Sequence, residues 1–341
     1  MTAAFHAALS FLLNVPHTTR DLPAIVALLL LDAEARRALD PMLWRIARDA
    51  STRIEKAAGA ALTGSQTSSG ELWFVAEQAA QIVGVTHAVL VPVPPIYDGS
   101  AGPPGLLLDD CFISADAPSG TAEALLTATE AALVSAGAPR LIASCPVAGP
   151  LRPLYERHGY EPVTLYMAKH RFSSDALPPE VRPASAEDVA GIVKRSVEYR
   201  RTLARIDSRF WHIHPEADSR FEAWMRRSLT FKDRDMFVAT AAGEVRGYVI
   251  AQPIAPLLVP AAHDLATVGV IDDFYDADFA DISAMPTDAS SGAKLLAAAE
   301  GAFTRRAIDS AVVVCPAGWP SKIALLHQRG YRTGKLWMLQ R

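Results

Sequence analysis

Two acidic pairs occupy corresponding places in this 341-residue chain: Asp109-Asp110 and Asp272-Asp273. Each pair lies in an apolar run that is typical of a strand. Successive strand residues point to opposite faces of a sheet, so one carboxylate of each pair can reach a cleft. There it can take up a proton, directly or through water, or bind an amine. The alternative is a solvated acid that caps a neighbouring loop.

A turn of small residues follows the first acidic pair and opens a helix predicted over residues 122–136. Backbone N–H groups and the helix dipole favour an anion at such a place, and glycine allows a close approach to the backbone. A similar turn precedes a helix predicted over 292–306. An ordinary helix start is the alternative at both. The binding candidates in the two turns are Ser119, Gly120, Thr121, Ala122, Ser291, Gly292 and Ala293.

The chain repeats itself, which is the first test to apply to a sequence of this length. Five landmarks recur in the same order. The clearest are Ser144-Cys145-Pro146 with Val314-Cys315-Pro316, His158-Gly159-Tyr160 with Arg329-Gly330-Tyr331, and Phe74-Val75-Ala76 with Phe237-Val238-Ala239. The two tripeptides that begin with phenylalanine are followed at equal spacing by a glycine, Gly84 in the first copy and Gly247 in the second. We therefore predict two tandem domains, 1–172 and 180–341, joined by a linker over 173–179.

The run from Leu106 to Lys169 resembles the core of the GNAT superfamily of acyl-CoA-dependent N-acetyltransferases. Three stretches carry the resemblance: Asp109-Asp110-Cys111-Phe112-Ile113, Gly120-Thr121-Ala122 and Leu154-Tyr155-Glu156-Arg157-His158-Gly159-Tyr160. The chain departs from the family pattern at Ala117, where the family usually has Gln or Arg.

The resemblance implies a fold, a cofactor and roles for residues. Each domain would be α/β (α+β), with a mixed, mostly antiparallel sheet that splays open at the acidic pair to admit the pantetheine arm of acetyl-CoA. Phe112, Ile113 and the two turns would bind this co-substrate, and Tyr155 would be the general acid. Asp110 and Asp273 would be catalytic bases. The reaction would be direct acyl transfer to a small amine in a ternary complex.

Asp109 and Asp272 are the amine-binding candidates of the two acidic pairs. Trp211 and His212 are candidates for the acceptor site, because the family shapes its acceptor pocket in their region. A buried tryptophan beside surface histidines is the alternative. His212 and His214 have the spacing of a metal pair, but no further ligand cluster is evident, so we expect no metal.

Two other hypotheses remain open. One or both copies could be a CoA-binding or structural module without catalysis. Alternatively, the C-terminal copy could be the enzyme and the N-terminal copy its scaffold. The chain has Leu326 where the first copy has Tyr155, and leucine cannot donate a proton, which favours the first copy for chemistry.

Composition excludes several classes of protein. The net charge is −4 and no basic stripe is present, which argues against a nucleic-acid partner. Three cysteines without a spacing motif argue against disulfides and zinc, and Cys145 and Cys315 are expected in the core. No apolar run reaches the roughly 18–20 residues that span a bilayer, and no signal peptide is evident, so we expect a cytoplasmic protein. The sequence does not indicate an oligomeric state.

Periodicity and turn residues predict the elements that hold these candidates in place. The principal predicted strands are 72–77, 82–92, 106–113, 140–147, 236–241, 245–252, 266–275, 311–315 and 333–340. The principal predicted helices are 21–39, 42–62, 122–136, 218–229, 292–306 and 321–328.

Overall fold

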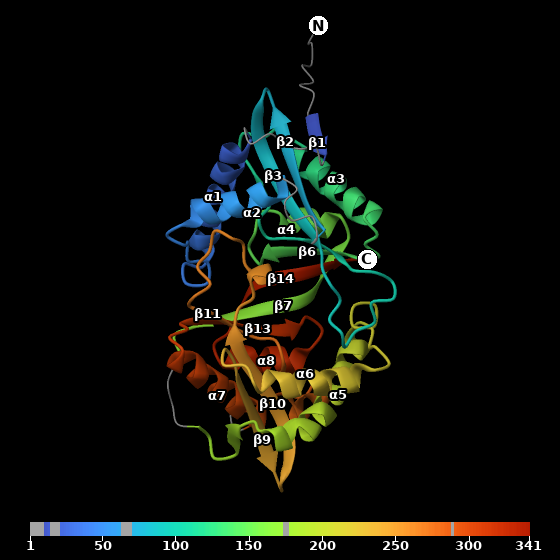
Figure 1. Ribbon diagram of the computed structural model, residues 1–341, viewed down its shortest axis with the longest axis vertical. Helices are drawn as coiled ribbons and strands as arrows, with labels where there is room; N and C mark the ends of the chain where they lie inside the picture. The colour runs from blue at the N-terminus through green and yellow to red at the C-terminus, as the bar shows by residue number, and fades with distance from the viewer. Residues whose placement is uncertain (1–9, 14–20, 63–69, 173–176, 288–289) are drawn as a thin grey trace.

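The computed structural model describes residues 10–13, 21–62, 70–172, 177–287 and 290–341. We call the residues up to 172 the N-terminal half and those from 177 the C-terminal half. Figure 1 shows the halves one above the other, with the strands running through both. The predicted linker over 173–179 lies partly outside the described residues.

The N-terminal half contains, in chain order, β1 (Ser10–Leu13), α1 (Leu22–Leu39), α2 (Ala50–Leu62), β2 (Glu71–Gln78), β3 (Gln81–Leu90), β4 (Gly105–Leu107), β5 (Phe112–Ile113), α3 (Thr121–Ser135), β6 (Leu141–Pro146), α4 (Arg152–Arg157) and β7 (Tyr160–His170).

The C-terminal half contains β8 (Val181–Pro183), the 3-10 turn η1 (Ala186–Asp188), α5 (Val189–Ile206), α6 (Ala217–Ser228), β9 (Asp235–Ala241), β10 (Glu244–Pro253), η2 (Pro256–Leu258), β11 (Val268–Ile271), β12 (Phe274–Asp276), η3 (Ala277–Ala280), α7 (Ser291–Arg305), β13 (Ser310–Pro316), α8 (Pro320–Gln328) and β14 (Arg332–Gln340).

The described strands form one 14-stranded mixed sheet that runs through both halves. Its order is β1-β2-β3-β4-β6-β14-β7-β13-β11-β10-β9-β8, with β5 on β3 and β12 on β10. Within it, β4 with β6 and β11 with β13 are the parallel pairs, and the other pairs are antiparallel. The predicted α/β class with a mixed, mostly antiparallel sheet is confirmed, and the two halves share the sheet.

The last strands of the two halves are exchanged. Strand β14 of the C-terminal half lies between β6 and β7 of the N-terminal half. In return, β7 lies between β14 and β13. Each half therefore completes its part of the sheet with a strand from the other half.

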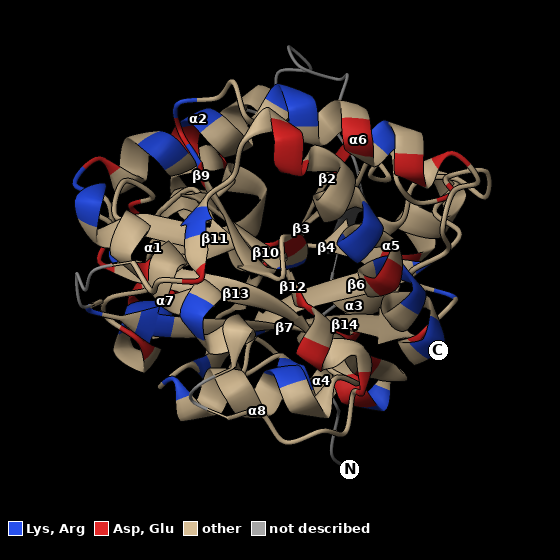
Figure 2. Cartoon of the chain, turned by 90° about the horizontal axis from the view of Figure 1, so that it is seen from below, with Lys and Arg blue, Asp and Glu red and all other residues tan. Residues whose placement is uncertain are grey.

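Helices cover the two faces of the sheet in pairs. We call the side that faces the viewer in Figure 1 the front face. Figure 2 shows α2 and α6 on this side and α4 and α8 on the opposite, back side. Helix α1 packs on β3 and α5 on β10, while α3 and α7 pack on the same strands from the back. Among the described residues, no helix has both the length and the apolarity needed to cross a membrane.

Local chemistry explains most helix boundaries. Pro23 stands in the first turn of α1, where its missing N–H costs nothing. Ser185 and Asp188 form a capping box at η1. Helix α3 begins after Gly120, whose φ of 88° is readily adopted only by glycine.

The predicted helix over 42–62 is wrong in its first third, because α2 begins only at Ala50. The carboxylate of Asp40 accepts hydrogen bonds from the N–H groups of Met42 and Leu43, at 3.1 and 2.9 Å. This aspartate turn directs the chain away from a helix. Helical periodicity alone does not reveal such a side-chain contact.

The predicted continuous strands over 106–113 and 266–275 are also wrong, since each is broken at its acidic pair. In the first, Cys111 N–H donates to the Asp109 carbonyl at 2.8 Å and turns the backbone locally. The strand then resumes against β3 alone. These breaks place the acidic pairs where the sheet opens.

Candidate functional site

A gap opens in the sheet of the N-terminal half. The parallel pairing of β4 with β6 ends at Leu107 and Ala143, while β6 continues through Ser144 to Pro146. No described strand pairs with this part of β6 on that side. The Ser144 hydroxyl is buried and has no hydrogen-bond partner among the described residues. The predicted splay is therefore present, and a polar group at its edge is free to bind a ligand.

The turn at the start of α3 is open to solvent. Ser119 and Gly120 are exposed, and no atom lies within 4 Å of a Cβ built on Gly120. Thr121 is buried and its hydroxyl donates to the Pro118 carbonyl at 2.8 Å, which fixes the turn. Ala122 is half-buried within α3. The backbone N–H of Thr121 also donates to the Pro118 carbonyl, at 3.1 Å, so the turn is held in shape while Gly120 stays open to solvent.

Strand β5 brings two further predicted cofactor residues to the same region. Phe112 and Ile113 are half-buried and pair with Val85 and Gly84 of β3. Gly84 is required there, because a Cβ on it would come within 2.8 Å of the Leu125 side chain of α3. This close contact holds α3 against the strand that borders the gap.

The corresponding turn of the C-terminal half is closed. Asp276 accepts hydrogen bonds from the Ser291 hydroxyl at 2.6 Å and from the Asp278 N–H at 3.0 Å. Gly292 and Ala293 are buried, and a Cβ on Gly292 would lie 2.8 Å from the ring of Phe279. The Ser290 hydroxyl accepts from the Ala293 N–H at 3.2 Å, so the chain itself caps the start of α7 while Phe279 packs against Gly292.

A lysine closes the gap of the C-terminal half. Lys322 of α8 is fully buried, and its Nζ donates to the Phe274 carbonyl at 2.8 Å. The same ammonium lies over the rings of Tyr199 and Trp319, at 5.0 and 5.6 Å. Burial lowers the pKa of Lys322 to about 8. Its side chain joins α8 to β12 across the opening between β12 and β13.

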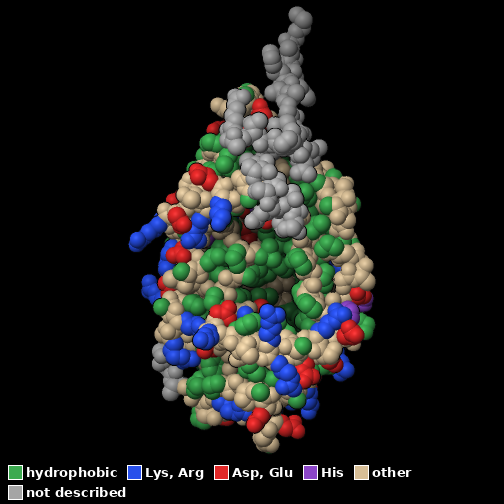
Figure 3. All heavy atoms as spheres, viewed as in Figure 1, with side chains coloured by type: hydrophobic (Ala, Val, Ile, Leu, Met, Phe, Trp, Pro, Cys, Tyr) green, Lys and Arg blue, Asp and Glu red, His purple; other side chains and the backbone are tan. Residues whose placement is uncertain are grey.

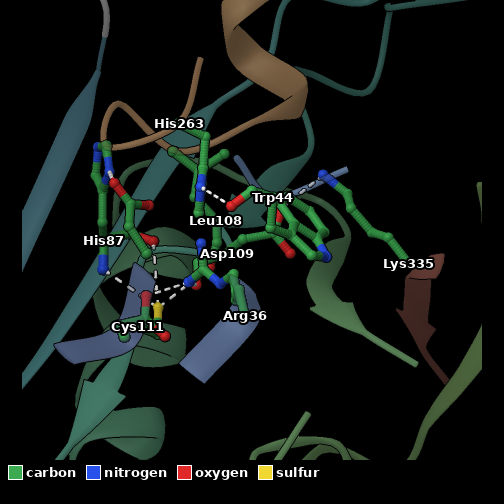
Figure 4. Close-up of polar contacts among 10 residues, drawn as sticks. Arg36, Trp44, His87, Leu108, Asp109, Cys111, His263 and Lys335 are labelled. Carbon is green, nitrogen blue, oxygen red and sulfur yellow. Dashed lines mark hydrogen bonds and ion pairs between the residues drawn. The ribbon is translucent and has the colours of Figure 1, made fainter. Parts of the chain in front are cut away.

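Asp109 lies in a buried ion pair at the edge of the N-terminal gap. Its Oδ2 is 2.5 Å from Nζ of Lys335, which the exchanged strand β14 supplies, and its carbonyl accepts from Arg36 of α1 (Figure 4). Lys335 Nζ also donates to the Leu258 carbonyl at 2.6 Å. Oδ1 of Asp109 is buried and has no partner among the described residues. One oxygen of this predicted substrate-binding residue is therefore free to accept a hydrogen bond.

Asp110 pairs with a histidine that sequence reasoning missed. Its Oδ2 lies 2.9 Å from Nδ1 of His87, and the His87 ring stacks on Trp73 with centroids 3.9 Å apart. Burial alone would raise the pKa of Asp110, but the attraction of His87 lowers it below the ordinary value. His87 Nε2 is buried without a described partner. A lone histidine in the apolar strand 81–90 was the available signal.

Asp32 and Arg36 of α1 extend this buried network and were also missed. They form an ion pair one helical turn apart. Burial raises the pKa of Asp32 to about 7, against the opposing effect of Arg36. The neighbouring cavity, about 10 Å³, is lined by Asp32, Arg36, Trp73 and Asp110 and closed by Ala262 of the C-terminal half. It has room for about one water molecule.

Tyr155 lies on the back face in the core between α3, α4 and the sheet. Its side chain is 2 % exposed, and its ring centroid is 5.7 Å from that of Tyr160. Burial raises its pKa well above the ordinary value, and the nearby Cys111 adds to the effect. The phenol therefore stays protonated throughout the neutral range. Leu326, its counterpart, is fully buried.

The acidic pair of the C-terminal half is more accessible. Asp272 is exposed, and its Oδ2 accepts from the Gln252 amide at 3.1 Å. Asp273 is half-buried and accepts from the Tyr248 hydroxyl at 3.2 Å. Burial raises the pKa of Asp273 to about 7, with a further contribution from Asp272.

Trp211 and His212 hold a connection between the halves. Trp211 is buried beside Phe210, at 4.9 Å between ring centroids. The His212 carbonyl accepts from the Asp98 N–H at 2.7 Å, and its exposed ring lies 3.5 Å from the Asp98 carboxylate. The segment after β3 is thereby bound to the segment after α5. The described residues contain no group of three or more His, Cys, Asp or Glu placed to hold a metal.

Comparison with known proteins supplies the fold family. No protein-family model matches the chain, and no curated protein matches it. Among solved structures, a tandem GNAT protein from the clavulanic acid biosynthesis pathway superposes with a TM-score of 0.51 at 13% identity, over 97% of each chain. A GCN5-related N-acetyltransferase from Sphaerobacter thermophilus superposes with a TM-score of 0.53 at 16% identity, over 97% of this chain and 94% of that one.

The chain has the tandem GNAT fold. The resemblance found in the sequence is thereby confirmed. Within this tandem GNAT fold the halves differ in opposite ways. The N-terminal half keeps an open turn beside Gly120, but its acids are engaged in internal pairs. The C-terminal half keeps an accessible acidic pair, but Phe279 and Lys322 close its turn and its gap.

Proposed function

We propose that the protein is an acyl-CoA-dependent N-acyltransferase that uses acetyl-CoA or a related acyl-CoA and a small amine, with the donor bound by the N-terminal half. One observation carries the proposal. The turn at Gly120 is open to solvent, whereas its counterpart at Gly292 is filled by the chain itself. An open helix start leaves room for the pyrophosphate of an acyl-CoA, which supports a donor in the N-terminal half.

The residues of the N-terminal half fit such a donor. The first N–H groups of α3 would bind the pyrophosphate, since a helix N-terminus attracts anions. The gap between β5 and β6 would admit the pantetheine arm, where the unpartnered Ser144 hydroxyl can form a hydrogen bond. The bound acyl-CoA supplies an activated acyl group, and its departure as a thiolate requires a proton.

The acceptor would approach from the front face. Oδ1 of Asp109 is unpartnered, and a carboxylate oxygen there can accept a hydrogen bond from an amine. Lys335 keeps the carboxylate in place through Oδ2. The predicted base Asp110 instead orients His87, whose free Nε2 offers a second acceptor for the amine proton. Direct transfer in a ternary complex needs these groups and no covalent intermediate.

Tyr155 would supply the proton to the departing thiolate. Its raised pKa keeps the phenol protonated, so the proton is available at neutral pH. A correctly placed general acid contributes on the order of 10²- to 10⁴-fold to rate.

The donor site is tested by calorimetric titration with acetyl-CoA. We expect one site per chain. Gly120→Val should weaken binding at least about tenfold, because a side chain there strains the backbone at a φ of 88° and occupies the open space of the turn. Gly137→Val is the matched control: Gly137 has a φ of 93° and open space around it, but it lies at the other end of α3. No binding, or equal affinity in the two variants, would contradict the donor assignment.

Turnover is tested with an amine panel and a thiol reagent that detects free CoA. Tyr155→Phe should lower kcat by about 10²-fold without changing acetyl-CoA affinity. Tyr160→Phe removes a neighbouring buried phenol and should leave kcat unchanged. Equal rates in the two variants would remove Tyr155 from the chemistry.

A second candidate function is a CoA-binding module without turnover. Two observations favour such a module. Asp109 is paired with Lys335 and Asp110 with His87, and the cavity beside Asp110 is small. This function predicts acetyl-CoA binding at one site and no CoA release with any amine. Catalysis in the C-terminal half, the remaining hypothesis, predicts that Asp273→Asn lowers turnover and that Tyr155→Phe does not.

A further inference from the structure

The front face of the sheet is hollowed between the two halves. Figure 3 shows this hollow in the middle of the molecule, with hydrophobic side chains gathered in it. Its position in Figure 1 coincides with β6, β14, β7 and β13, the strands joined by the exchange. We call the front side chains of these four strands the floor.

Register fixes which side chains make the floor. Trp337 of β14 lies directly across from Ser144 of β6 on one side and Thr164 of β7 on the other. Tyr166 of β7 lies across from Val314 of β13. Residues directly opposite each other in a sheet share a face, so these side chains form two adjacent rows. Lys335 of β14 also lies across from Tyr166, where it is buried in its pair with Asp109. Apart from this paired lysine, the middle of the floor is aromatic and aliphatic.

Polar atoms without partners lie along the floor and at its end. The Ser144 hydroxyl and the Trp337 indole N–H have no hydrogen-bond partner among the described residues. The same holds for Oε1 of Gln252, whose amide nitrogen bonds Asp272. Ser144 is only 2 % exposed. Buried polar groups are normally satisfied, so unpartnered ones on one face point to a ligand that satisfies them.

The floor is charged at the end that belongs to the C-terminal half. Ile271 pairs with Val313, so Asp272 lies level with Val314 in the next strand. Asp272 is exposed, and the half-buried Asp273 follows it. At the other end, Ser144 borders the donor gap. A carboxylate therefore stands at one end of an apolar floor and the site of acyl transfer at the other.

We propose that the floor binds an elongated amine, with a cationic group at Asp272, an apolar chain over Trp337 and the reacting nitrogen at the donor gap that Ser144 borders. Neighbouring strands lie about 4.8 Å apart, so the four steps from β11 to β6 span about 19 Å. A short amine cannot reach both ends. This inference rests on the proposed function, because the donor gap defines the reacting end.

The test is calorimetric binding of amines to the protein without acyl-CoA. The probe is 1,12-diaminododecane, whose extended chain covers most of that span. Dodecylamine, kept below its micellar concentration, lacks the far charge, and 1,4-diaminobutane lacks the length. The variants are Asp272→Asn and a matched control, Asp281→Asn, which changes an exposed acid in the segment that packs against α8 on the back.

We expect the long diamine to bind more tightly than either other amine, and Asp272→Asn to weaken it at least about tenfold. Asp281→Asn should change nothing. Equal affinity of the long and short diamines, or no effect of Asp272→Asn, would overturn the proposal. Titration of the same samples with acetyl-CoA distinguishes the proposed acyl-CoA site from the proposed amine site. If the protein binds the long diamine but not acetyl-CoA, the acyl-CoA site is refuted and the amine site is not.

Discussion

The buried pair of Lys335 and Asp109 joins the exchanged strand β14 to the N-terminal half, and its removal yields a sharp prediction. Nζ and Oδ2 are 2.5 Å apart, and the two side chains are 4 % and 2 % exposed. Breaking a buried ion pair by removing one partner costs about 3–5 kcal/mol, because the remaining charge stays buried. Lys335→Met should therefore lower the free energy of unfolding by that amount.

The destabilisation caused by Lys335→Met should be reversed when Asp109 is replaced as well. Oδ1 of Asp109 already lacks a described partner, so the variant leaves both oxygens without an ammonium. Replacing both members with apolar residues removes the unpaired charge, and such replacements are often neutral or stabilising. The double variant Lys335→Met/Asp109→Leu should therefore lie within about 1 kcal/mol of the wild type. The double-mutant cycle should give a coupling energy of about 3 kcal/mol or more.

The assay is equilibrium unfolding in urea, followed by far-ultraviolet circular dichroism and tryptophan fluorescence, whose coincidence tests two-state behaviour. Lys294→Met is the control. It breaks a 2.8 Å pair with Glu180 at the surface, where about 0–1 kcal/mol is expected. The reasoning is refuted if Lys335→Met costs less than about 1 kcal/mol, or if the double variant is no more stable than the single one.

Three further predictions follow from the same geometry. Because the pKa of Asp273 is raised to about 7, its contribution to stability is present below about pH 4 and is lost as the pH rises through 7. Asp273→Asn should remove that decline and gain about 1–3 kcal/mol over the wild type at pH 8 but not at pH 4, in urea unfolding; an unchanged pH slope would disprove it. Gly292→Ala should lower the free energy of unfolding by about 1–3 kcal/mol, because it forces a Cβ against Phe279. The affinity for acetyl-CoA should stay constant, and a loss of affinity would place a donor site in the C-terminal half. Residues 1–172 alone should show no cooperative unfolding, because β6 and β7 lack β14, and adding residues 177–341 should restore it; a cooperative isolated fragment would mean that the exchange is dispensable.

Sequence patterns predicted most elements because their causes are local. Helix α1 and the β2–β3 pair follow from periodicity and turn residues, and their observed bounds agree closely with those expected. The aspartate turn after α1 involves a single side chain and escaped the pattern. The breaks at the acidic pairs arise because only one of the two neighbouring strands continues to pair beyond that point. The residues of the broken strand itself do not specify this.

The candidate site could be predicted only in part, for the same reason. The turn at Gly120 is continuous in the chain, and its open geometry matches the expectation. The partners of the acids are not continuous with them. Lys335 is 226 positions from Asp109, and the strand exchange that brings them together depends on pairing between halves with similar patterns. For His87, the only indication of a role in the site was that a polar residue occurs within an apolar strand.

The exchange of β7 and β14 bears on how such a chain can evolve. After duplication of an ancestral unit, either copy could ordinarily be deleted once its chemistry had been lost. Here deletion would remove a central strand from the surviving copy as well. Selection for the fold of one copy therefore maintains the other copy as well. The second copy therefore persists as long as it supplies β14 to the first.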